Sequence, residues 1–232
     1  MSYHVLRIWQ TGPDPCHDAK WRPITGSRPE ALGTFRAALG EGPVWRTENG
    51  TVLWIDIRGA ALLETDPRKG RTGVVALTEA PGAVALTKAG ALLAMGQALV
   101  LDGREIARLP SGLPGRFNDG KPDLAGRFWT GTANALGRAE CALWCFDGRF
   151  VQALAGVKMS NGLGWSSDGR CLYHVDTGTL SLDALDCAPD GSLSNRRSLL
   201  RLPAGQLPAG LTVDAEGRVW LALWGRVLVC CA

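Results

Sequence analysis

The apolar residues of this chain fall in short runs that are separated by glycine, proline and polar residues. Thirty glycines and 13 prolines are spread along the sequence, and almost no stretch of 10 residues keeps a helical hydrophobic period free of both. Short apolar or alternating runs bounded by turn residues are typical of β-strands. The pattern therefore predicts an all-β fold.

One unit recurs five times along the chain: a polar residue, a glycine, and then a short apolar strand. Its glycines are Gly50, Gly90, Gly126, Gly169 and Gly217, spaced 40, 36, 43 and 48 residues apart. A second apolar strand precedes each unit, at residues 43–45, 83–86, 121–124, 162–165 and 210–213. A period of about 40 to 50 residues with several short strands is typical of the blades of a β-propeller. Each blade then buries its faces against its neighbours.

The residues just before these inner strands are expected to meet at one mouth of the propeller channel. They are Glu41, Pro81 with Gly82, Asn118 with Asp119, Asn161, and Ala209. A single asparagine before a strand is commonly a turn residue. Here two asparagines and one glutamate recur at the same blade position, which favours a shared site built from carboxylate and amide oxygens.

Composition and charge narrow the classes of partner. The chain is 46% hydrophobic and 20% charged, which is typical of a globular protein, and its net charge is +3 with the basic residues scattered singly. Nothing in it predicts a nucleic-acid partner or an obligate protein partner. Apolar runs such as 219–224 are far shorter than the 18 or so residues that span a membrane, and no signal peptide is recognisable. We therefore expect a cytoplasmic protein without a membrane partner.

The cysteines and histidines do not form a recognisable site in the sequence. Cys141 and Cys145 are four residues apart, with no CxxC and no HxxxH spacing in the chain, so two buried side chains on one sheet face are expected rather than zinc ligands. His174 lies in the strand-like segment CLYHVD and is expected to be a sheet residue rather than a catalytic base.

Several motifs carry a resemblance to a known family. They are GEGPVW (40–45), RFNDGK (116–121), MSNGLGWSSDGR (159–170), DGSLSNRR (190–197) and LTVDAEGRVW (211–220). Over about residues 36–229 the sequence resembles the gluconolactonase family, which includes regucalcin, the senescence marker protein and the luciferin-regenerating enzyme. The order RFNDGK, then SNGL about 40 residues later, is highly specific.

The resemblance implies a six-bladed β-propeller, of which this chain is expected to hold about four and a half blades. The expected domains are an N-terminal extension of unclear structure at residues 1–35 and an incomplete propeller at 36–232. Because an incomplete ring leaves strand edges unpaired, an open ring is expected.

The resemblance also implies hydrolysis of small sugar lactones with one divalent cation, calcium or zinc. Glu41 and Asn161 match metal ligands of the family, and Arg116 and Asn118 match residues that contact the lactone and its water. The family's third ligand and general base is an aspartate, and this chain has Ala209 there, so no catalytic base is assigned and weak cation binding is expected. Asp214 is too far along the strand, roughly 16 Å, to replace it.

Two functions therefore stay open from the sequence. The intact RFNDGK and SNGL motifs favour a metal-assisted lactone hydrolase. Ala209 and the missing blade favour an inactive or degenerate propeller fragment, or a scaffold that binds a small ligand.

Overall fold

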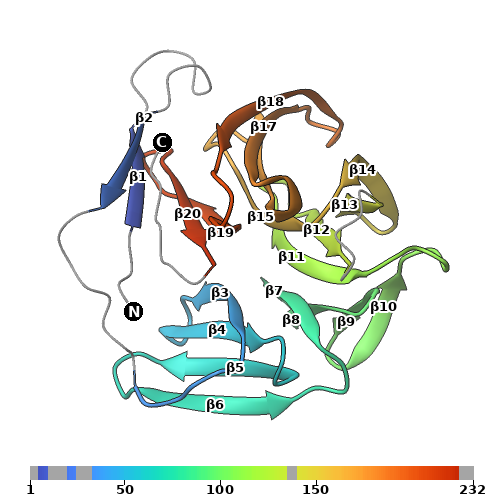
Figure 1. The fold of residues 1–232 in the computed structure, drawn as a ribbon. Helices are drawn as coiled ribbons and strands as arrows, with labels where there is room; N and C mark the ends of the chain where they lie inside the picture. Colours follow the sequence, from blue (N-terminus) through green and yellow to red (C-terminus); the bar gives the residue numbers. More distant parts are fainter. Residues whose placement is uncertain (1–4, 10–19, 25–32, 135–139, 225–232) are drawn as a thin grey trace.

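The structure is a computed structural model that describes residues 5–9, 20–24, 33–134 and 140–224. These residues form antiparallel β-sheets arranged around a common centre, and their one helix is a single 3-10 turn, η1 (Thr177–Thr179) (Figure 1). The all-β, propeller-type fold predicted from the sequence is confirmed. In the described part of the chain no helix is long and apolar enough to cross a membrane.

Four sheets have four strands each, and every strand pairs with the next one in sequence. The first contains β3 (Gly40–Arg46), β4 (Thr51–Asp56), β5 (Ala61–Asp66) and β6 (Arg71–Ala76). The second contains β7 (Pro81–Thr87), β8 (Gly90–Met95), β9 (Ala98–Leu101) and β10 (Arg104–Arg108). The third contains β11 (Arg116–Pro122), β12 (Phe128–Ala133), β13 (Cys141–Phe146) and β14 (Phe150–Val157). The fourth contains β15 (Ser160–Trp165), β16 (Cys171–Asp176), β17 (Ser181–Cys187) and β18 (Leu193–Arg201).

Two further sheets have two strands each. One is β19 (Pro208–Val213) with β20 (Val219–Leu223), and the other is β1 (Val5–Trp9) with β2 (Lys20–Ile24), which comes from the expected N-terminal extension. β1 lies beside β20 (Figure 1). The rest of the extension up to residue 32, and the expected abrupt end at 225–232, lie outside the described residues.

The first strands of successive sheets lie next to one another in the order β3, β7, β11, β15 and β19, so they are the inner strands (Figure 1). The expectation for the third sheet was wrong in its bounds. Its inner strand is Arg116–Pro122 rather than 121–124, and Leu124 is 69% exposed in the following turn. RFNDGK is therefore part of the inner strand itself.

The recurring glycines lie in the hairpin turns after the inner strands or, for Gly90, at the first residue of the next strand, and all five have positive φ, which favours glycine. In the DAEGRVW turn the Asp214 carboxylate accepts hydrogen bonds from the Arg218 backbone N–H at 2.9 Å and from Trp220 Nε1 at 2.8 Å. Asp123 makes the same bonds to Arg127 and Trp129 in the third sheet. Asp214 therefore stabilises its own turn, and it does not line the cavity described below.

The hydrophobic core lies between neighbouring sheets, where apolar faces of adjacent sheets pack together.

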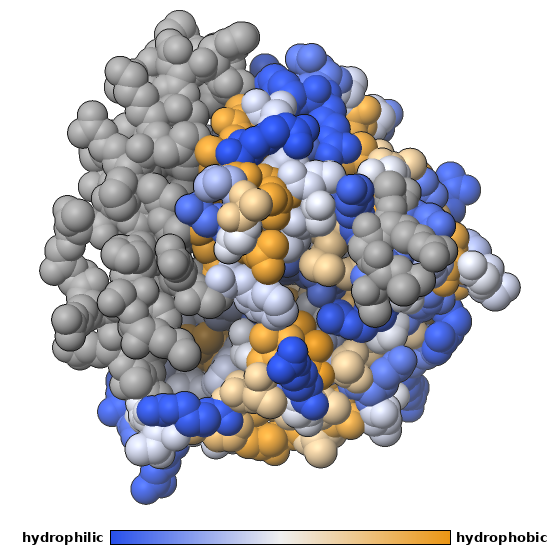
Figure 2. Space-filling model, viewed as in Figure 1, coloured by the Kyte–Doolittle hydropathy of each residue, from blue (hydrophilic) through white to orange (hydrophobic). Residues whose placement is uncertain are grey.

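Cys141 and Cys145 are buried free thiols on β13, as expected. Among the described residues no group of three or more His, Cys, Asp or Glu side chains could hold a metal ion. Figure 2 shows hydrophilic and hydrophobic residues interspersed over the described part of one face.

His174 lies in strand β16, as expected, and is fully buried. Its Nε2 is 2.8 Å from Ser160 Oγ. Burial lowers the pKa of His174 to about 4, although Asp176 and Asp183 oppose this shift and Arg196 supports it. The unfolded histidine has a pKa near 6.5 and binds a proton that the folded state excludes. Its contribution to stability is therefore complete above pH 6.5 and is lost as the pH falls toward 4, by about 3 kcal/mol.

We expect urea denaturation of the parent and of His174→Gln to show this difference between pH 7 and pH 4.5. The parent should lose stability relative to the variant over that interval, because the variant has no imidazole to protonate. The pKa of Glu41 is raised to about 7, so its protonation changes the free energy of unfolding with the opposite sign in the same pH interval. Both proteins contain Glu41, so its effect cancels when the two are compared. Equal pH dependence in the two proteins would contradict the prediction.

Candidate functional site

The inner strands share an irregularity at the end where the predicted site residues stand. Each contains a β-bulge, with one more residue than the partner strand, between Glu41 and Val44, Pro81 and Ala83, Phe117 and Gly120, Ser160 and Leu163, and Pro208 and Leu211. A bulge interrupts the alternation of side chains and turns them to a new direction. Asn118, Asp119, Asn161 and Ala209 all fall within these bulges.

The inner strands approach each other closely at this end because glycines face the neighbouring backbone. A Cβ on Gly82 would overlap the Phe117 carbonyl and lie 2.6 Å from the Asn118 oxygen. A Cβ on Gly162 would overlap the Leu211 nitrogen and lie 2.6 Å from the Gly210 carbonyl carbon. The close approach narrows the ring, so that side chains from different sheets can reach the same point.

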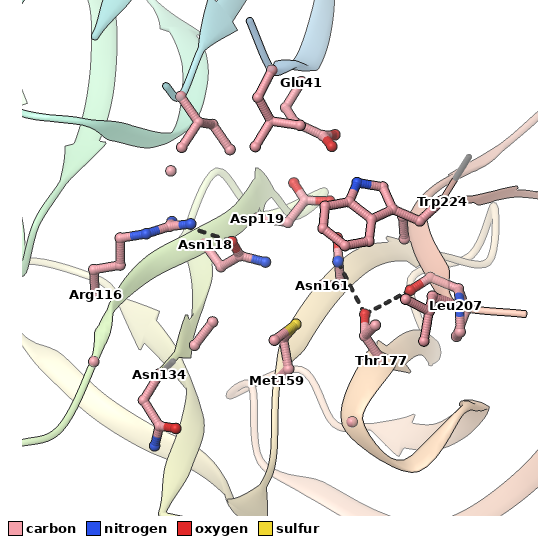
Figure 3. Close-up of a pocket in the computed structure, with 18 of the residues that line it drawn as sticks. Glu41, Arg116, Asn118, Asp119, Asn134, Met159, Asn161, Thr177, Leu207 and Trp224 are labelled. Carbon is pink, nitrogen blue, oxygen red and sulfur yellow. Dashed lines mark hydrogen bonds between the residues drawn. The ribbon is translucent and has the colours of Figure 1, made fainter. Parts of the chain in front are cut away.

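Together these features form a cavity of about 1230 Å³ at one end of the ring (Figure 3). All the residues proposed from the sequence line it: Glu41, Arg116, Asn118, Asn161 and Ala209. Asp119, Met159 and Trp224 also line it, and Trp224 is 54% exposed. The expected convergence of these positions at one mouth is therefore observed in the structure.

The Asn161 amide is oriented by a chain of hydrogen bonds. Its Nδ2 donates to Thr177 Oγ1 at 3.0 Å, and that hydroxyl donates to the Pro208 carbonyl at 2.6 Å. With the nitrogen held in this way (Figure 3), Oδ1 has no hydrogen-bond donor within the described part of the chain and is available to the cavity. Thr177 was not identified from the sequence, because only the fold brings η1 next to β15 and β19.

Arg116 and Asn118 form a connected pair on β11. Arg116 Nη1 donates to the Phe117 carbonyl at 2.7 Å and to Asn118 Oδ1 at 3.2 Å, while Asn118 Nδ2 donates to the Ser160 carbonyl at 2.8 Å. Burial lowers the pKa of the Arg116 guanidinium. No carboxylate of the described residues forms an ion pair with it, so its remaining N–H groups can bind oxygen atoms of a ligand.

Glu41 is a half-buried carboxylate without an ion-pair partner in the described part of the chain. Burial and the charge of the nearby Asp119 raise its pKa to about 7. Two interacting carboxylates in one cavity make it attractive to cations, since a cation relieves their mutual repulsion.

Two aspartates that the sequence analysis did not identify hold the strand starts in place. The Asp56 carboxylate accepts from the backbone N–H groups of Ala38 and Leu39 at 2.8 and 2.9 Å, and the Asp176 carboxylate accepts from those of Lys158 and Met159 at 3.2 and 2.9 Å. Glu41 and Asn161 each stand two residues after these amides. The repeated aspartate at the end of the second strand of a sheet, in WIDI and YHVD, was the available sequence signal.

Comparison with known proteins identifies the family. The sequence profile of the SMP-30/Gluconolactonase/LRE-like region matches residues 39–231. The chain belongs to this family. Regucalcin of Xenopus laevis is 37% identical over 210 residues, which cover 82% of this chain and 70% of that protein. A Bacillus subtilis (strain 168) protein with the name "Putative sugar lactone lactonase YvrE" is 32% identical over 203 residues, with the same coverage.

Solved structures agree with this assignment to the SMP-30/gluconolactonase family. The calcium-binding protein regucalcin of Agrobacterium tumefaciens superimposes with a TM-score of 0.77 at 28% identity, covering 84% of this chain and 70% of that one. The family includes gluconolactonases, which are lactone hydrolases, and regucalcins.

The donor atoms of the cavity suit the kind of cation that this family membership implies. Glu41 offers a carboxylate and Asn161 an oriented amide oxygen, and hard divalent cations such as calcium prefer oxygen ligands of these kinds. Ala209 is buried in the wall of the same cavity and contributes only a methyl group. The donor types of the cavity therefore suit a cation, with one charged donor fewer than an aspartate at position 209 would give.

Proposed function

We propose that this cavity hydrolyses small sugar lactones with the help of one divalent cation, calcium or zinc, held by Glu41 and Asn161. The observation that carries the proposal is the convergence of Glu41, Arg116, Asn118 and Asn161, from three different sheets, on one cavity. The name of the Bacillus subtilis relative, which refers to a sugar lactone lactonase, supports the same reaction class.

In this proposal the side chains of the cavity bind the lactone and stabilise the charge that develops on it. Arg116 can pair with the lactone oxygens and with the negative charge that develops on the carbonyl oxygen during attack by water. Asn118 holds the guanidinium in place, because its Oδ1 accepts from Arg116 Nη1 while its Nδ2 is fixed by the Ser160 carbonyl. A bound divalent cation polarises a carbonyl group and lowers the pKa of a water molecule.

In the proposed reaction, removal of a proton from the attacking water is the step that lacks a general base at position 209. Position 209 offers no carboxylate, and general-base help contributes about 10²- to 10⁴-fold to such reactions. The proposed enzyme is therefore slow. Ala209 also supports the second candidate function, a scaffold that binds a small sugar-like ligand in the same cavity without hydrolysing it.

The proposal predicts a specific effect of Arg116→Lys on lactone hydrolysis followed by proton release. Lysine keeps the charge but loses the planar arrangement of N–H donors, so kcat/KM should fall by about 10- to 100-fold. Arg58→Lys is the matched control, since Arg58 also lines the cavity and has no assigned role. The control should change kcat/KM by less than about twofold.

The same assay separates the two candidate functions. Hydrolysis by the parent that is lost in Glu41→Gln supports the enzyme. A parent that binds lactones in calorimetry but releases no acid from any of a panel of sugar lactones would support the scaffold instead. An Arg116→Lys variant as active as the parent would contradict the role given to Arg116.

A further inference from the structure

Asp119 is a carboxylate of the cavity to which the proposed function gives no role. It lies in the bulge of β11 beside Asn118 and lines the cavity. Figure 3 shows its carboxylate turned toward the space that Glu41 and Asn161 border. The bulge is what directs it there, because in a regular strand two successive side chains would point to opposite faces.

One oxygen of Asp119 faces the segment that carries Ala209. A methyl group placed on the Cα of Gly210 would lie 4.0 Å from Asp119 Oδ2, and Gly210 is the neighbour of Ala209 in the β19 bulge. Glu41 lines the same cavity, so the two carboxylates border one volume. Asp119 therefore borders the same cavity as Glu41 and faces the β19 bulge that contains Ala209.

The hydrogen bonds of Asp119 leave one oxygen available. Oδ1 accepts from the Gly120 N–H at 2.7 Å, whereas Oδ2 has no hydrogen bond or ion pair with any residue that the structure describes. The positive charge of Lys121 acts on Asp119, but Lys121 Nζ donates to the Leu211 carbonyl at 2.9 Å. Burial raises the pKa of Asp119. An oxygen in this state is stabilised by any cation that reaches it.

We propose that Asp119 is the second carboxylate ligand of the cation in this chain, in place of the ligand absent at position 209. The inference rests on the proposed function, because it assumes the cation at the mouth. The resulting donor set is two carboxylates, from Glu41 and Asp119, and the Asn161 amide oxygen. Two carboxylates balance the charge of a divalent cation, and an all-oxygen set of this kind favours calcium over zinc.

Calorimetric titration with calcium chloride tests the inference on the full chain. Asp119→Asn keeps the Oδ1 acceptor for Gly120 but removes the charge, and it should weaken calcium binding by about 10-fold or more. Glu140→Gln is the matched control, because it removes one negative charge from the lining of the same cavity at an exposed position. Its calcium affinity should stay within about twofold of the parent.

A double-mutant cycle with Ala209→Asp separates ligation from a general charge effect. If Asp119 replaces the missing ligand, Asp119→Asn should weaken binding less in the Ala209→Asp background than in the parent, since the new carboxylate takes over part of its role. Melting curves without calcium check folding. Asp119→Asn should melt no lower than the parent because it relieves repulsion with Glu41, and Asp119→Ser serves if the asparagine variant does not fold.

The outcomes distinguish this inference from the proposed function. Calcium binding that weakens in Glu41→Gln but stays within twofold of the parent in Asp119→Asn would overturn the role of Asp119 and leave the proposed function standing. Equal weakening in Asp119→Asn and Glu140→Gln would also overturn it, as a general charge effect. A parent that shows neither heat of calcium binding nor a calcium-induced rise in melting temperature would overturn the cation site itself, and the inference with it.

Discussion

Replacing Ala209 by aspartate is expected to raise divalent-cation affinity by about one to two decades. Ala209 is buried in the cavity wall, and Pro208 and Gly210 flank it in the β19 bulge, which would aim a new carboxylate into the mouth. The added charge should also raise any lactone hydrolysis, because it supplies the general base that position 209 lacks. Calorimetric titrations with calcium and with zinc, followed by the proton-release assay, measure the two effects.

The Ala209→Asp substitution should also destabilise the cation-free protein. A carboxylate at position 209 would join Glu41 and Asp119 in the lining of the same cavity, so the cation-free variant should melt at a lower temperature than the parent, and calcium should restore it. Ala209→Asn is the control, since it has nearly the same shape without the charge and should gain much less affinity. If Ala209→Asp bound cations no better than the parent, the scaffold function would be favoured over the hydrolase.

Gly162→Ala is expected to destabilise the fold by about 2 to 4 kcal/mol. The new Cβ would overlap the backbone nitrogen of Leu211 and lie 2.7 Å from the Ala209 carbonyl oxygen. These are backbone atoms of the neighbouring inner strand, so no rotation of a side chain can relieve the overlap. The strands must separate, and the mouth that contains Asn161 should widen with them.

Urea denaturation with Gly73→Ala as the control measures this effect. Gly73 is also a strand glycine without positive φ, but it is exposed on β6 and its nearest neighbour is the Glu64 carbonyl oxygen at 3.8 Å from the new Cβ. That variant should stay within about 0.5 kcal/mol of the parent. Equal denaturation midpoints for the two variants would show that the inner strands are not held together as closely as the structure indicates.

Much of the fold could be predicted because its signals are local. A hairpin glycine with positive φ and the apolar strand beside it are properties of a few consecutive residues, and their repetition indicated the blades. The prediction failed at 121–124, where the inner strand begins at Arg116 instead. RFNDGK contains polar and charged residues because it faces a cavity, so hydrophobicity alone could not identify it as a strand.

The site was predicted only as far as residue types at equivalent blade positions allowed. Glu41, Asn118 and Asn161 could be found in this way, and they line one cavity. Thr177 could not be found in this way. The repeated aspartate of WIDI and YHVD marked Asp56 and Asp176 but did not indicate their roles, because all three residues make hydrogen bonds to segments that are 16 to 31 residues away in the chain. Hydrogen-bond partners at such separations depend on how the sheets are placed against one another.

By itself, the sequence determined the all-β class, the spacing of the units and the set of polar residues at the strand starts, because each depends on neighbouring residues and on a repeated period. The tertiary structure alone decided which of these side chains share a cavity and how each is oriented. Asp119 shows the difference. Its relation to Ala209 arises because β11 and β19, some 90 residues apart, both bulge toward the same mouth, and a bulge depends on strand pairing rather than on local sequence.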